Sequence, residues 1–420
     1  MRMSDHTSTK SFDIPKSWVW QAYLKVKSNK GSAGADGVDL DAFEENVGPH
    51  LYKIWNRLSS GSYMPPPVLQ VEIPKASGNG VRILGIPSIS DRVAQTVVKQ
   101  LIEPILDPVF HADSYGFRPG KSAKQAVAVT RNRCWKHDWV VEFDIKGAFD
   151  NIDHGLLLKA LEHHVSERWV LLYVKRWLKA PFVDKHGSLT TRSMGTPQGS
   201  VIGPLLLNLF MHYAFDKWMD RENPYCPFAR YADDAVIHCH SRREAEQLLR
   251  SVAERLGECG LELHPAKSKV VYCKDSNRHG VYENMQFVFL GFCFRPRCAP
   301  SRSGRAFTSF LPAICNDAKK NIRQTIRRWC LQGLSTFSLV EIAERFNPII
   351  RGWINYYGAF YKQELGRVFR HLDNKLVLWA QRKFTQFRQR RGRARRWLVL
   401  SLVSQPNLFV HWKEFSAKCA

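Results

Sequence analysis

The spacing of hydrophobic and polar residues predicts alternating helices and strands over the first 300 residues of the chain. The first 60 residues have a helical pattern, which a glycine-rich loop at 29–39 interrupts. Three prolines within 62–67 predict a rigid connector. Beyond it, alternating runs at 69–73 and 81–86 flank a Gly-Asn-Gly turn, which predicts a β-hairpin.

The middle of the chain changes several times between strand-like and helical spacing. A helix is expected from Asp91 to about Ile105, and a strand at Val140–Phe143 precedes an amphipathic helix from about His154. The stretch 241–260 has the clearest helical pattern, with a capping box, an apolar stripe and a terminal glycine. The residues concerned are Ser241 and Glu244 in the box, Ala245, Leu249, Val252 and Leu256 in the stripe, and Gly260.

The last third of the chain is mostly helical in pattern. Residues 286–294, QFVFLGFCF, are interpreted as one strand, and helical spacing begins after about Arg305. Loops are expected within the helical region at RFNPIIRGW (345–353) and RRGRARR (390–396). The boundary between the mixed region and the helical region is therefore placed at 301–305, and we expect an α+β fold.

The charge distribution points to a polyanionic partner. The 420 residues have a formal net charge of +24. Residues 301–420 hold 23 Lys+Arg against 6 Asp+Glu, a net of +17, whereas the remaining 300 residues have a net of only +7. The same basic segment is rich in Trp and Tyr, and proteins grip RNA and single strands with aromatic faces beside cations. We expect nucleic-acid binding, with a membrane surface as the main alternative.

Cysteine usage and hydropathy argue against several other classes of protein. The ten cysteines include no CxxC pair and no Cys/His cluster, a pattern typical of reduced thiols rather than a zinc site. No apolar run approaches the roughly 20 residues that span a bilayer. The N-terminus has no signal-peptide pattern, so we expect a cytoplasmic protein without membrane association.

Three aspartates stand at the ends of predicted strands. Asp233 and Asp234 lie inside the mostly apolar run FARYADDAVIHC, and Asp144 ends the strand VVEFD. Burying adjacent like charges is costly unless a partner neutralises them. Gathered at one sheet edge, three carboxylates would suit Mg²⁺, and two such ions promote phosphoryl transfer. The alternative is one turn Asp and one helix-capping Asp with no metal.

Several sequence blocks, taken in order, favour the metal site. They are VRILGIPS, SYGFRPGKSA, FDIKGAFDNID, MGTPQGSVIGPLLLNLF, RYADDAVI and LELHPAKSK, and they resemble the blocks of a reverse transcriptase. NKGSAGADGVD, HADSYGFRPGKSA and IIRGWINYYGAF narrow the resemblance to a bacterial group II intron-encoded reverse transcriptase and maturase, over about Trp18 to Trp412. A phosphate-binding loop is excluded in YGFRPGKSA, because only three residues separate Gly116 from Gly-Lys-Ser where that motif needs four.

The resemblance implies a right-hand polymerase of fingers, palm and thumb, with a helical, basic C-terminal thumb and maturase region. Residues 1–60 would form an N-terminal extension and the start of the fingers. Residues 61–300 would form the fingers and palm. Residues 301–420 would form the thumb and the RNA-binding maturase region.

The same resemblance assigns roles to residues of the palm. Asp144 and Asp233 would hold two Mg²⁺ ions, with Asp234 beside them in a supporting role. Phe149 would lie under the sugar of the incoming nucleotide, and Gln198 would line the nucleotide pocket. The alternatives are a core phenylalanine at a strand–helix junction and a purely structural Pro-Gln-Gly turn.

Basic residues are implied around the triphosphate. Lys75 and Arg82 flank the turn of the predicted hairpin and would clamp the phosphates, since growing negative charge there needs cations placed in advance. An exposed hairpin with two basic residues is the alternative. Lys267 or Lys269 would protonate the pyrophosphate leaving group, and the sequence does not choose between them. The alternative is a solvated basic end of a strand.

RNA contacts are expected in the C-terminal third. Arg351, Trp353 and Tyr356 are the candidates in IIRGWINYY, although Trp353 is more typical of a helical core. A second group of candidates lies in a run of arginines that would contact phosphates. These are Arg388, Arg390, Arg391, Arg393, Arg395 and Arg396.

The resemblance therefore implies an RNA-directed DNA polymerase that copies intron RNA and serves as a splicing maturase. Its partners would be group II intron RNA, a DNA target or primer, and deoxynucleoside triphosphates, and it would join the nucleoid when on DNA. One alternative is an RNA-binding splicing factor with a vestigial polymerase. Another is a defence or diversification reverse transcriptase without an intron. Many members of the family carry an endonuclease domain that this sequence does not show, so the primer is expected from elsewhere.

Overall fold

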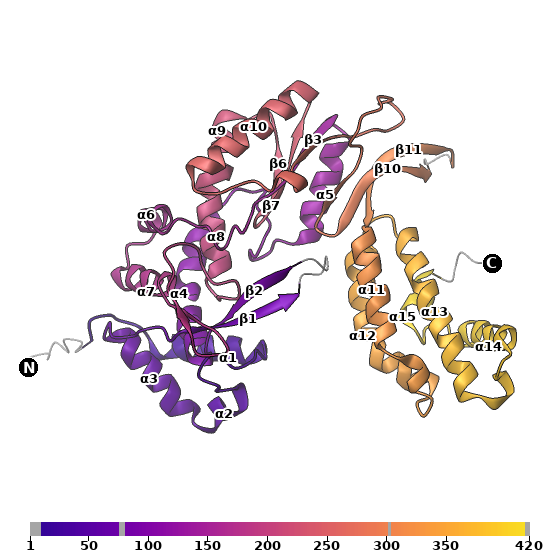
Figure 1. Ribbon diagram of the computed structural model, residues 1–420, viewed down its shortest axis with the longest axis horizontal. Coiled ribbons are helices and arrows are strands. Elements are labelled where there is room, and N and C mark those ends of the chain that lie inside the picture. Colours follow the sequence, from indigo (N-terminus) through magenta and orange to yellow (C-terminus); the bar gives the residue numbers. More distant parts are fainter. Residues whose placement is uncertain (1–9, 75–79, 301–303, 416–420) are drawn as a thin grey trace, which may run out of the picture. The chain divides into compact units, whose positions relative to one another are not determined.

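The computed structural model describes residues 10–74, 80–300 and 304–415 (Figure 1). The chain divides into two compact units, each described by itself. The first unit holds Met1–Ala126 and Val141–Val270, and the second holds Val127–Val140 and Val271–Ala420. The predicted turn residues Gly78 and Asn79, and the candidate Lys75, lie outside the described residues.

Both units contain helices and strands. The first contains α1 (Lys16–Ser28), α2 (Leu40–Glu45), α3 (Val47–Ser59), β1 (Val68–Pro74), β2 (Val81–Ile86), α4 (Ile89–Leu106), α6 (His154–His164), α7 (Arg168–Leu178), β4 (Phe182–Val183), β5 (Leu189–Thr190), α8 (Gly203–Met211), α9 (Lys217–Glu222), β6 (Phe228–Tyr231), β7 (Asp234–Cys239) and α10 (Arg242–Glu258). The second contains β9 (Phe287–Phe289), β10 (Phe292–Pro300), β11 (Ala306–Ile314), α11 (Asn316–Arg328), α12 (Leu339–Tyr357), α13 (Gln363–Lys383), α14 (Arg391–Ser404) and α15 (Val410–Phe415). The division passes through α5 (Ala123–Cys134), β3 (Trp139–Asp144) and β8 (Lys269–Tyr272). This mixture confirms the α+β prediction.

Strands β6, β7, β3 and β8 form a four-stranded sheet in that order, and Figure 1 labels the first three of them. β6 and β7 are antiparallel, with Tyr231 opposite Asp234. Helix α10 packs on β7, and Phe143 of β3 meets the ring of Phe215 edge-on at 5.4 Å. The apolar sides of these strands are buried, so the sheet gives a rigid base to the residues at its edge.

The predicted β-hairpin is confirmed as β1 and β2, which pair from Leu69 opposite Ile86 to Pro74 opposite Val81. They belong to a second sheet in the order β2-β1-β4-β5. The prediction succeeded because β-branched residues alternate on both sides of an obvious turn.

Helix α10 confirms the predicted N-cap at Ser241 and differs in one residue of the buried stripe. The predicted capping box is wrong, because the Glu244 carboxylate accepts the backbone N–H of His240 and not that of Ser241. The Ser241 hydroxyl accepts the Glu244 backbone N–H at 3.2 Å, as an N-cap does. Leu248 is buried, whereas Leu249, which was expected in the stripe, is only half-buried. With 3.6 residues per turn, Leu248 and Leu249 both lie close to the apolar stripe, so the sequence does not tell which of them is buried. The element that packs against the helix decides this.

The strand expected at 286–294 is wrong in detail, because the segment forms the hairpin β9–β10. Leu290 and Gly291 make its turn with φ of 51° and 76°. Two consecutive positive φ values are typical of a type I′ turn. Leucine is rare at the first of these positions, so Leu290-Gly291 does not match the turn sequences from which a hairpin is predicted. The helical region also begins later than expected, since β11 pairs with β10 over nine residues.

The two loops expected in the C-terminal third are also wrong, because both segments are helical. Helix α12 runs through RFNPIIRGW with Pro348 inside it. Its buried residues Phe346 and Ile350 lie on either side of Pro348. Their burial offsets the free energy lost with the backbone hydrogen bond that a proline cannot make. Helix α14 covers most of RRGRARR, where Ala394 is buried among exposed arginines.

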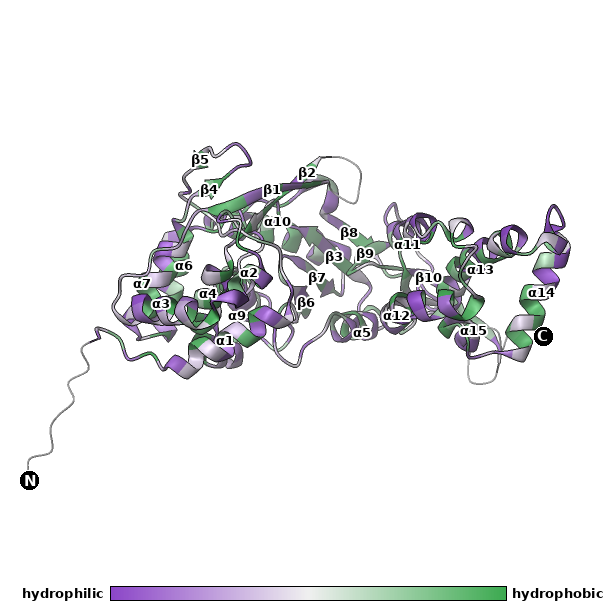
Figure 2. Ribbon diagram, turned by 90° about the horizontal axis from the view of Figure 1, so that it is seen from below, coloured by the Kyte–Doolittle hydropathy of each residue, from purple (hydrophilic) through white to green (hydrophobic). Residues whose placement is uncertain are grey.

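Helices α11 to α15 share one apolar core in the second unit. In Figure 2 these helices carry both hydrophobic and hydrophilic colours, as expected of helices that bury one side. Trp379 of α13 is fully buried, and its ring N–H donates to the backbone oxygen of Leu334 at 2.9 Å. Within the described part of the chain, every helix is too short or too polar to cross a bilayer.

Candidate active site

The two adjacent aspartates lie at the tip of the β6–β7 hairpin. Ala232 and Asp233 form the two-residue turn, and Asp234 is the first residue of β7. Ala232 has a φ of 59°, a left-handed conformation that is uncommon for alanine. The turn therefore places Asp233 outside the strand pairing, at the end of the sheet where β7 begins and β3 ends.

Asp144 ends β3, the strand next to β7 in the sheet. Its backbone oxygen accepts the N–H of His264 at 2.8 Å, and its carboxylate accepts a hydrogen bond from the Lys267 ammonium. Lys269 instead pairs with Glu142 at 3.3 Å. Of the two lysines between which the sequence did not choose, only Lys267 contacts an aspartate of the candidate site.

The negative charge of Asp144 acts on the carboxylate of Asp233. Burial raises the pKa of Asp233 above its usual value of 3.8, and the negative charge of Asp144 raises it further. The backbone N–H of Asp233 and the charges of Arg82 and Arg230 act in the opposite direction without cancelling the rise. A cation at this edge would relieve the repulsion, and carboxylate oxygens are the ligands that Mg²⁺ prefers.

A chain of hydrogen bonds connects the β1–β2 hairpin to the segment after β3. The Arg82 Nε donates to Oε1 of Gln198 at 2.5 Å, and Nε2 of Gln198 donates to the Asp150 carboxylate at 2.9 Å. Because a carboxylate only accepts, Asp150 fixes which end of the Gln198 amide faces Arg82. Asp150 is not among the residues predicted from the sequence, although it directly follows the candidate Phe149.

The loop that carries Gln198 is held by backbone contacts on both sides. The N–H of Thr196 donates to the oxygen of Phe149 at 2.7 Å, and the N–H of Gly85 donates to the oxygen of Gln198 at 2.7 Å. Gly199 has a φ of 116°, and a Cβ there would lie 2.3 Å from the oxygen of Gly85. Only glycine allows this approach, which aligns the loop with β2.

The candidates in the second unit divide into packed and exposed residues. Trp353 stacks on Trp329 at 5.5 Å, and Trp329 stacks on Phe346 at 4.2 Å, so Trp353 belongs to the edge of the helical core. The Tyr356 hydroxyl donates to the backbone oxygen of Leu290 at 2.9 Å, whereas Arg351 is exposed. The arginines of the run are also exposed: Arg388, Arg390, Arg391, Arg393, Arg395 and Arg396.

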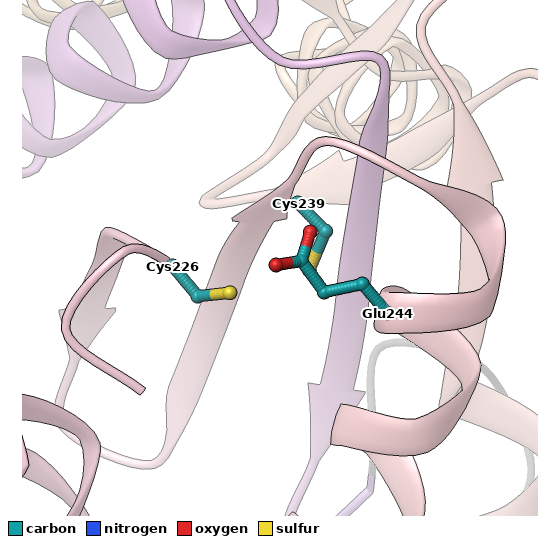
Figure 3. A group of neighbouring side chains, drawn as sticks. All are labelled: Cys226, Cys239 and Glu244. Atoms are coloured by element: carbon teal, nitrogen blue, oxygen red, sulfur yellow. The ribbon is translucent and has the colours of Figure 1, made fainter. Parts of the chain in front are cut away.

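A different group of potential metal ligands lies at the other end of the β6–β7 hairpin (Figure 3). Ligand atoms of Cys226, Cys239 and Glu244 lie within 4.8 Å of one another. One oxygen of Glu244 accepts the backbone N–H of His240 at 2.7 Å. A hydrogen bond with Cys226 and burial raise the pKa of the Cys239 thiol, which favours its protonated form. Glu244 therefore has a backbone partner, and the group lies at the opposite end of the hairpin from Asp233.

Comparison with known proteins adds to this geometry. The family model "Reverse transcriptase (RNA-dependent DNA polymerase)" matches residues 73–294, and the model "Group II intron, maturase-specific domain" matches residues 319–397. The first match spans the sheet with Asp144 and Asp233, the Gln198 loop and Lys267. The second spans most of helices α11 to α14.

The chain is also similar to curated proteins. It is 30% identical over 313 residues to Protein YkfC of Escherichia coli, covering 65% of this chain and 79% of that protein. It is 32% identical over 258 residues to the group II intron-encoded protein LtrA of Lactococcus lactis, covering 59% of this chain but only 42% of LtrA. Among solved structures, a telomerase from Candida albicans in complex with a telomeric RNA fragment matches at 12% identity with a TM-score of 0.47, over 90% of this chain and 68% of that one.

Proposed function

We propose that this chain, which belongs to the reverse transcriptase family and carries a group II intron maturase-specific domain, copies group II intron RNA into DNA and assists the splicing of that RNA. The observation that carries the polymerase half is the placement of Asp144 at the end of β3 and of Asp233 in the turn before β7, because β3 and β7 are neighbours in one sheet. Two carboxylates at the ends of neighbouring strands, with cationic side chains around them, fit phosphoryl transfer assisted by divalent ions.

In this proposal Asp144 and Asp233 hold two Mg²⁺ ions, and Asp234 supports them from the start of β7. The ions would help to activate the attacking hydroxyl and to stabilise the leaving oxygen. Lys267 already donates to Asp144. It would leave that carboxylate when the ions bind, and would then be close enough to give a proton to the pyrophosphate.

Arg82 and Gln198 would receive the nucleotide. Arg82 is held by a neutral amide, so a triphosphate competes for it more easily than it would for an arginine paired with a carboxylate. Gln198 keeps its orientation through Asp150 while Arg82 moves. Phe149 lies one residue before Asp150 and is half-buried, as a residue under a sugar would be. Lys75 is proposed on the resemblance alone.

The maturase half rests on the exposed basic surface of the second unit. Arg351 and the run from Arg388 to Arg396 would contact intron RNA phosphates. Trp353 and Tyr356 remain candidates for RNA contact, although their packing indicates that they stabilise helix α12, which also carries Arg351. With a net charge of +24, the protein would act wherever its RNA, DNA primer and deoxynucleoside triphosphates meet, in the cytoplasm and at the nucleoid.

The test is primer extension on an intron RNA template with Mg²⁺ and deoxynucleotides, with wild type beside Asp233→Ala. We expect DNA synthesis by wild type, none by the variant, and equal RNA binding by both. A folded wild type that binds intron RNA but makes no DNA would overturn the polymerase half and leave an RNA-binding splicing factor. Normal synthesis by Asp233→Ala would overturn the metal assignment.

A further inference from the structure

A fully buried arginine lies three residues before Asp233. Arg230 is in β6, and its side chain is 0% exposed. Charged side chains are almost never fully buried unless they are paired, and the reverse transcriptase chemistry proposed above does not use Arg230 directly. Its partners show what it holds in place.

The first partner is Asp216, which is also 0% exposed. Nε of Arg230 donates to Oδ1 of Asp216 at 2.7 Å, and Nη2 donates to Oδ2 at 2.6 Å. Burial alone would raise the pKa of Asp216, but the charge and hydrogen bonds of Arg230 hold it below its usual value. Asp216 lies in a π-helical turn at His212–Asp216, a feature often found at functional sites.

The remaining terminal nitrogen of Arg230, Nη1, donates toward the Ala232–Asp233 turn. Nη1 donates to the backbone oxygen of Ala232 at 2.9 Å and to Oδ1 of Asn208 at 3.1 Å. Ala232 is the residue with the left-handed φ of 59°. The guanidinium therefore connects Asp216 to the one peptide whose unusual conformation decides where Asp233 points.

The turn is also enclosed from its other side. Nδ2 of Asn208, which is fully buried in α8, donates to the oxygen of Gly116 at 2.7 Å. The N–H of Tyr115 donates to the oxygen of Arg230 at 2.8 Å. A Cβ at Gly116 would lie 2.4 Å from the nitrogen of Ala232, so the backbones of the two segments touch. The Ala232–Asp233 turn is thus clamped between Gly116 and the Arg230 side chain.

We propose that Arg230, oriented by Asp216 and Asn208, is a positioning residue that fixes the Ala232–Asp233 turn so that Asp233 can bind a divalent cation together with Asp144. This inference rests on the proposed function for its catalytic meaning, but its structural part can be measured without catalysis. A planar guanidinium can form the fork to Asp216 and the bond to Ala232 at the same time, and a lysine ammonium cannot match that geometry.

The test measures three quantities in wild type, Arg230→Lys and a paired variant, Arg230→Met with Asp216→Leu. They are the affinity for Mn²⁺ by calorimetry without RNA, the hydrogen exchange of the turn peptide, and the Mg²⁺ concentration for half-maximal primer extension. The paired variant removes both buried charges together, so the fold is kept more readily than when one charge is left alone.

We expect both variants to bind Mn²⁺ about 10-fold more weakly, as when residues that orient a metal ligand are changed. Exchange at residues 231–234 should be faster, and the Mg²⁺ midpoint should rise by a similar factor, while RNA affinity stays unchanged. A folded paired variant with wild-type Mn²⁺ affinity and wild-type exchange at the turn would overturn the proposal and leave Arg230 as a core ion pair.

A matched control separates a local effect from a general one. Lys319 and Glu364 form another largely buried pair, in the second unit. Lys319→Met with Glu364→Leu should leave Mn²⁺ affinity and turn exchange unchanged, and an equal loss there would overturn the proposal. If wild type makes no DNA, the polymerase proposal fails, yet weaker Mn²⁺ binding by the Arg230 variants would still support the positioning role.

Discussion

The Lys267 ammonium donates a hydrogen bond to the Asp144 carboxylate across 123 residues of sequence. A side-chain cation thus contacts the carboxylate that we propose as a metal ligand. The contact makes Lys267 and a divalent ion competitors for Asp144. It also brings a proton donor to the edge of the sheet where phosphoryl transfer would occur.

Replacing Lys267 should therefore separate metal binding from chemistry. In Lys267→Met we expect the Mg²⁺ concentration for half-maximal synthesis to fall. The rate at saturating Mg²⁺ should fall by about 100-fold, a typical contribution of a general acid. Lys269→Met is the control, because Lys269 pairs with Glu142 instead, and its rate should stay close to wild type. Equal losses in the two variants would contradict the assignment of the acid to Lys267.

The raised pKa of Asp233 predicts a stability effect with a definite sign. A carboxyl whose folded pKa is raised binds its proton more readily in the folded state, so the free energy of unfolding falls as pH rises from near 3.8 toward the raised value. Without divalent ions, Asp233→Asn should lack this contribution and be more stable than wild type at neutral pH.

The measurement is the difference in melting temperature between Asp233→Asn and wild type in EDTA, at pH 4 and at pH 7. We expect the difference to be larger at pH 7. Added Mg²⁺ should then stabilise wild type only, because the ion binds the folded carboxylates. A difference that does not change with pH would show that Asp233 is not strained by its surroundings.

Asp150 should act on nucleotide binding rather than on chemistry. In Asp150→Ala the Nε2 of Gln198 loses the carboxylate to which it donates, and the amide can turn over. We therefore expect KM for deoxynucleotides to rise about fivefold. This is less than the loss of a buried charge-assisted hydrogen bond would cause, because Asp150 is exposed. The kcat should change little. Asp150→Asn keeps an acceptor oxygen and should recover part of the affinity. A large fall in kcat with KM unchanged would place Asp150 in the chemical step instead.

The exposed arginines predict a salt-dependent weakening of RNA binding. Replacing Arg390, Arg391, Arg393 and Arg395 by Gln should weaken intron RNA binding. The salt slope should fall by about 0.7 for each phosphate of single-stranded RNA that is no longer neutralised. Four exposed cations of the first unit, replaced together, serve as the control: Lys25, Lys53, Arg243 and Arg250. An unchanged slope in the first variant would move the RNA site elsewhere.

Trp353 and Arg351 lie two residues apart on α12 but should behave differently. Trp353→Ala should lower the free energy of unfolding by about 3 kcal/mol, because it removes a half-buried ring stacked on Trp329. Arg351→Ala should change stability by less than about 0.5 kcal/mol, since its side chain is exposed, and should weaken RNA binding. Urea unfolding and RNA titration of both variants would test this, and a stable Trp353→Ala that loses RNA binding would reverse the assignment.

The sequence by itself determined the elements whose signals are local. The β1–β2 hairpin, the cap of α10 and the placement of Asp144 and Asp233 at the ends of strands depend on alternation, on a turn or on a capping residue within a few positions. Propensity and side-chain spacing act over that range, so these predictions are confirmed with only small errors, such as Leu249 predicted in the buried stripe where Leu248 is found.

The tertiary structure decided what depends on neighbours far apart in the chain. The register of the segment 265–272 beside β3 brought Lys267, and not Lys269, to Asp144. Burial on both sides of Pro348 kept α12 continuous where the local signal indicated a loop. In the sequence, Arg230 has the pattern of an ordinary strand residue. The structure shows that its guanidinium is bound by Asp216, Asn208 and the Ala232 oxygen. Hydrogen bonds and buried contacts between distant segments outweigh local preference, because a buried polar group must find its partner wherever the fold places one.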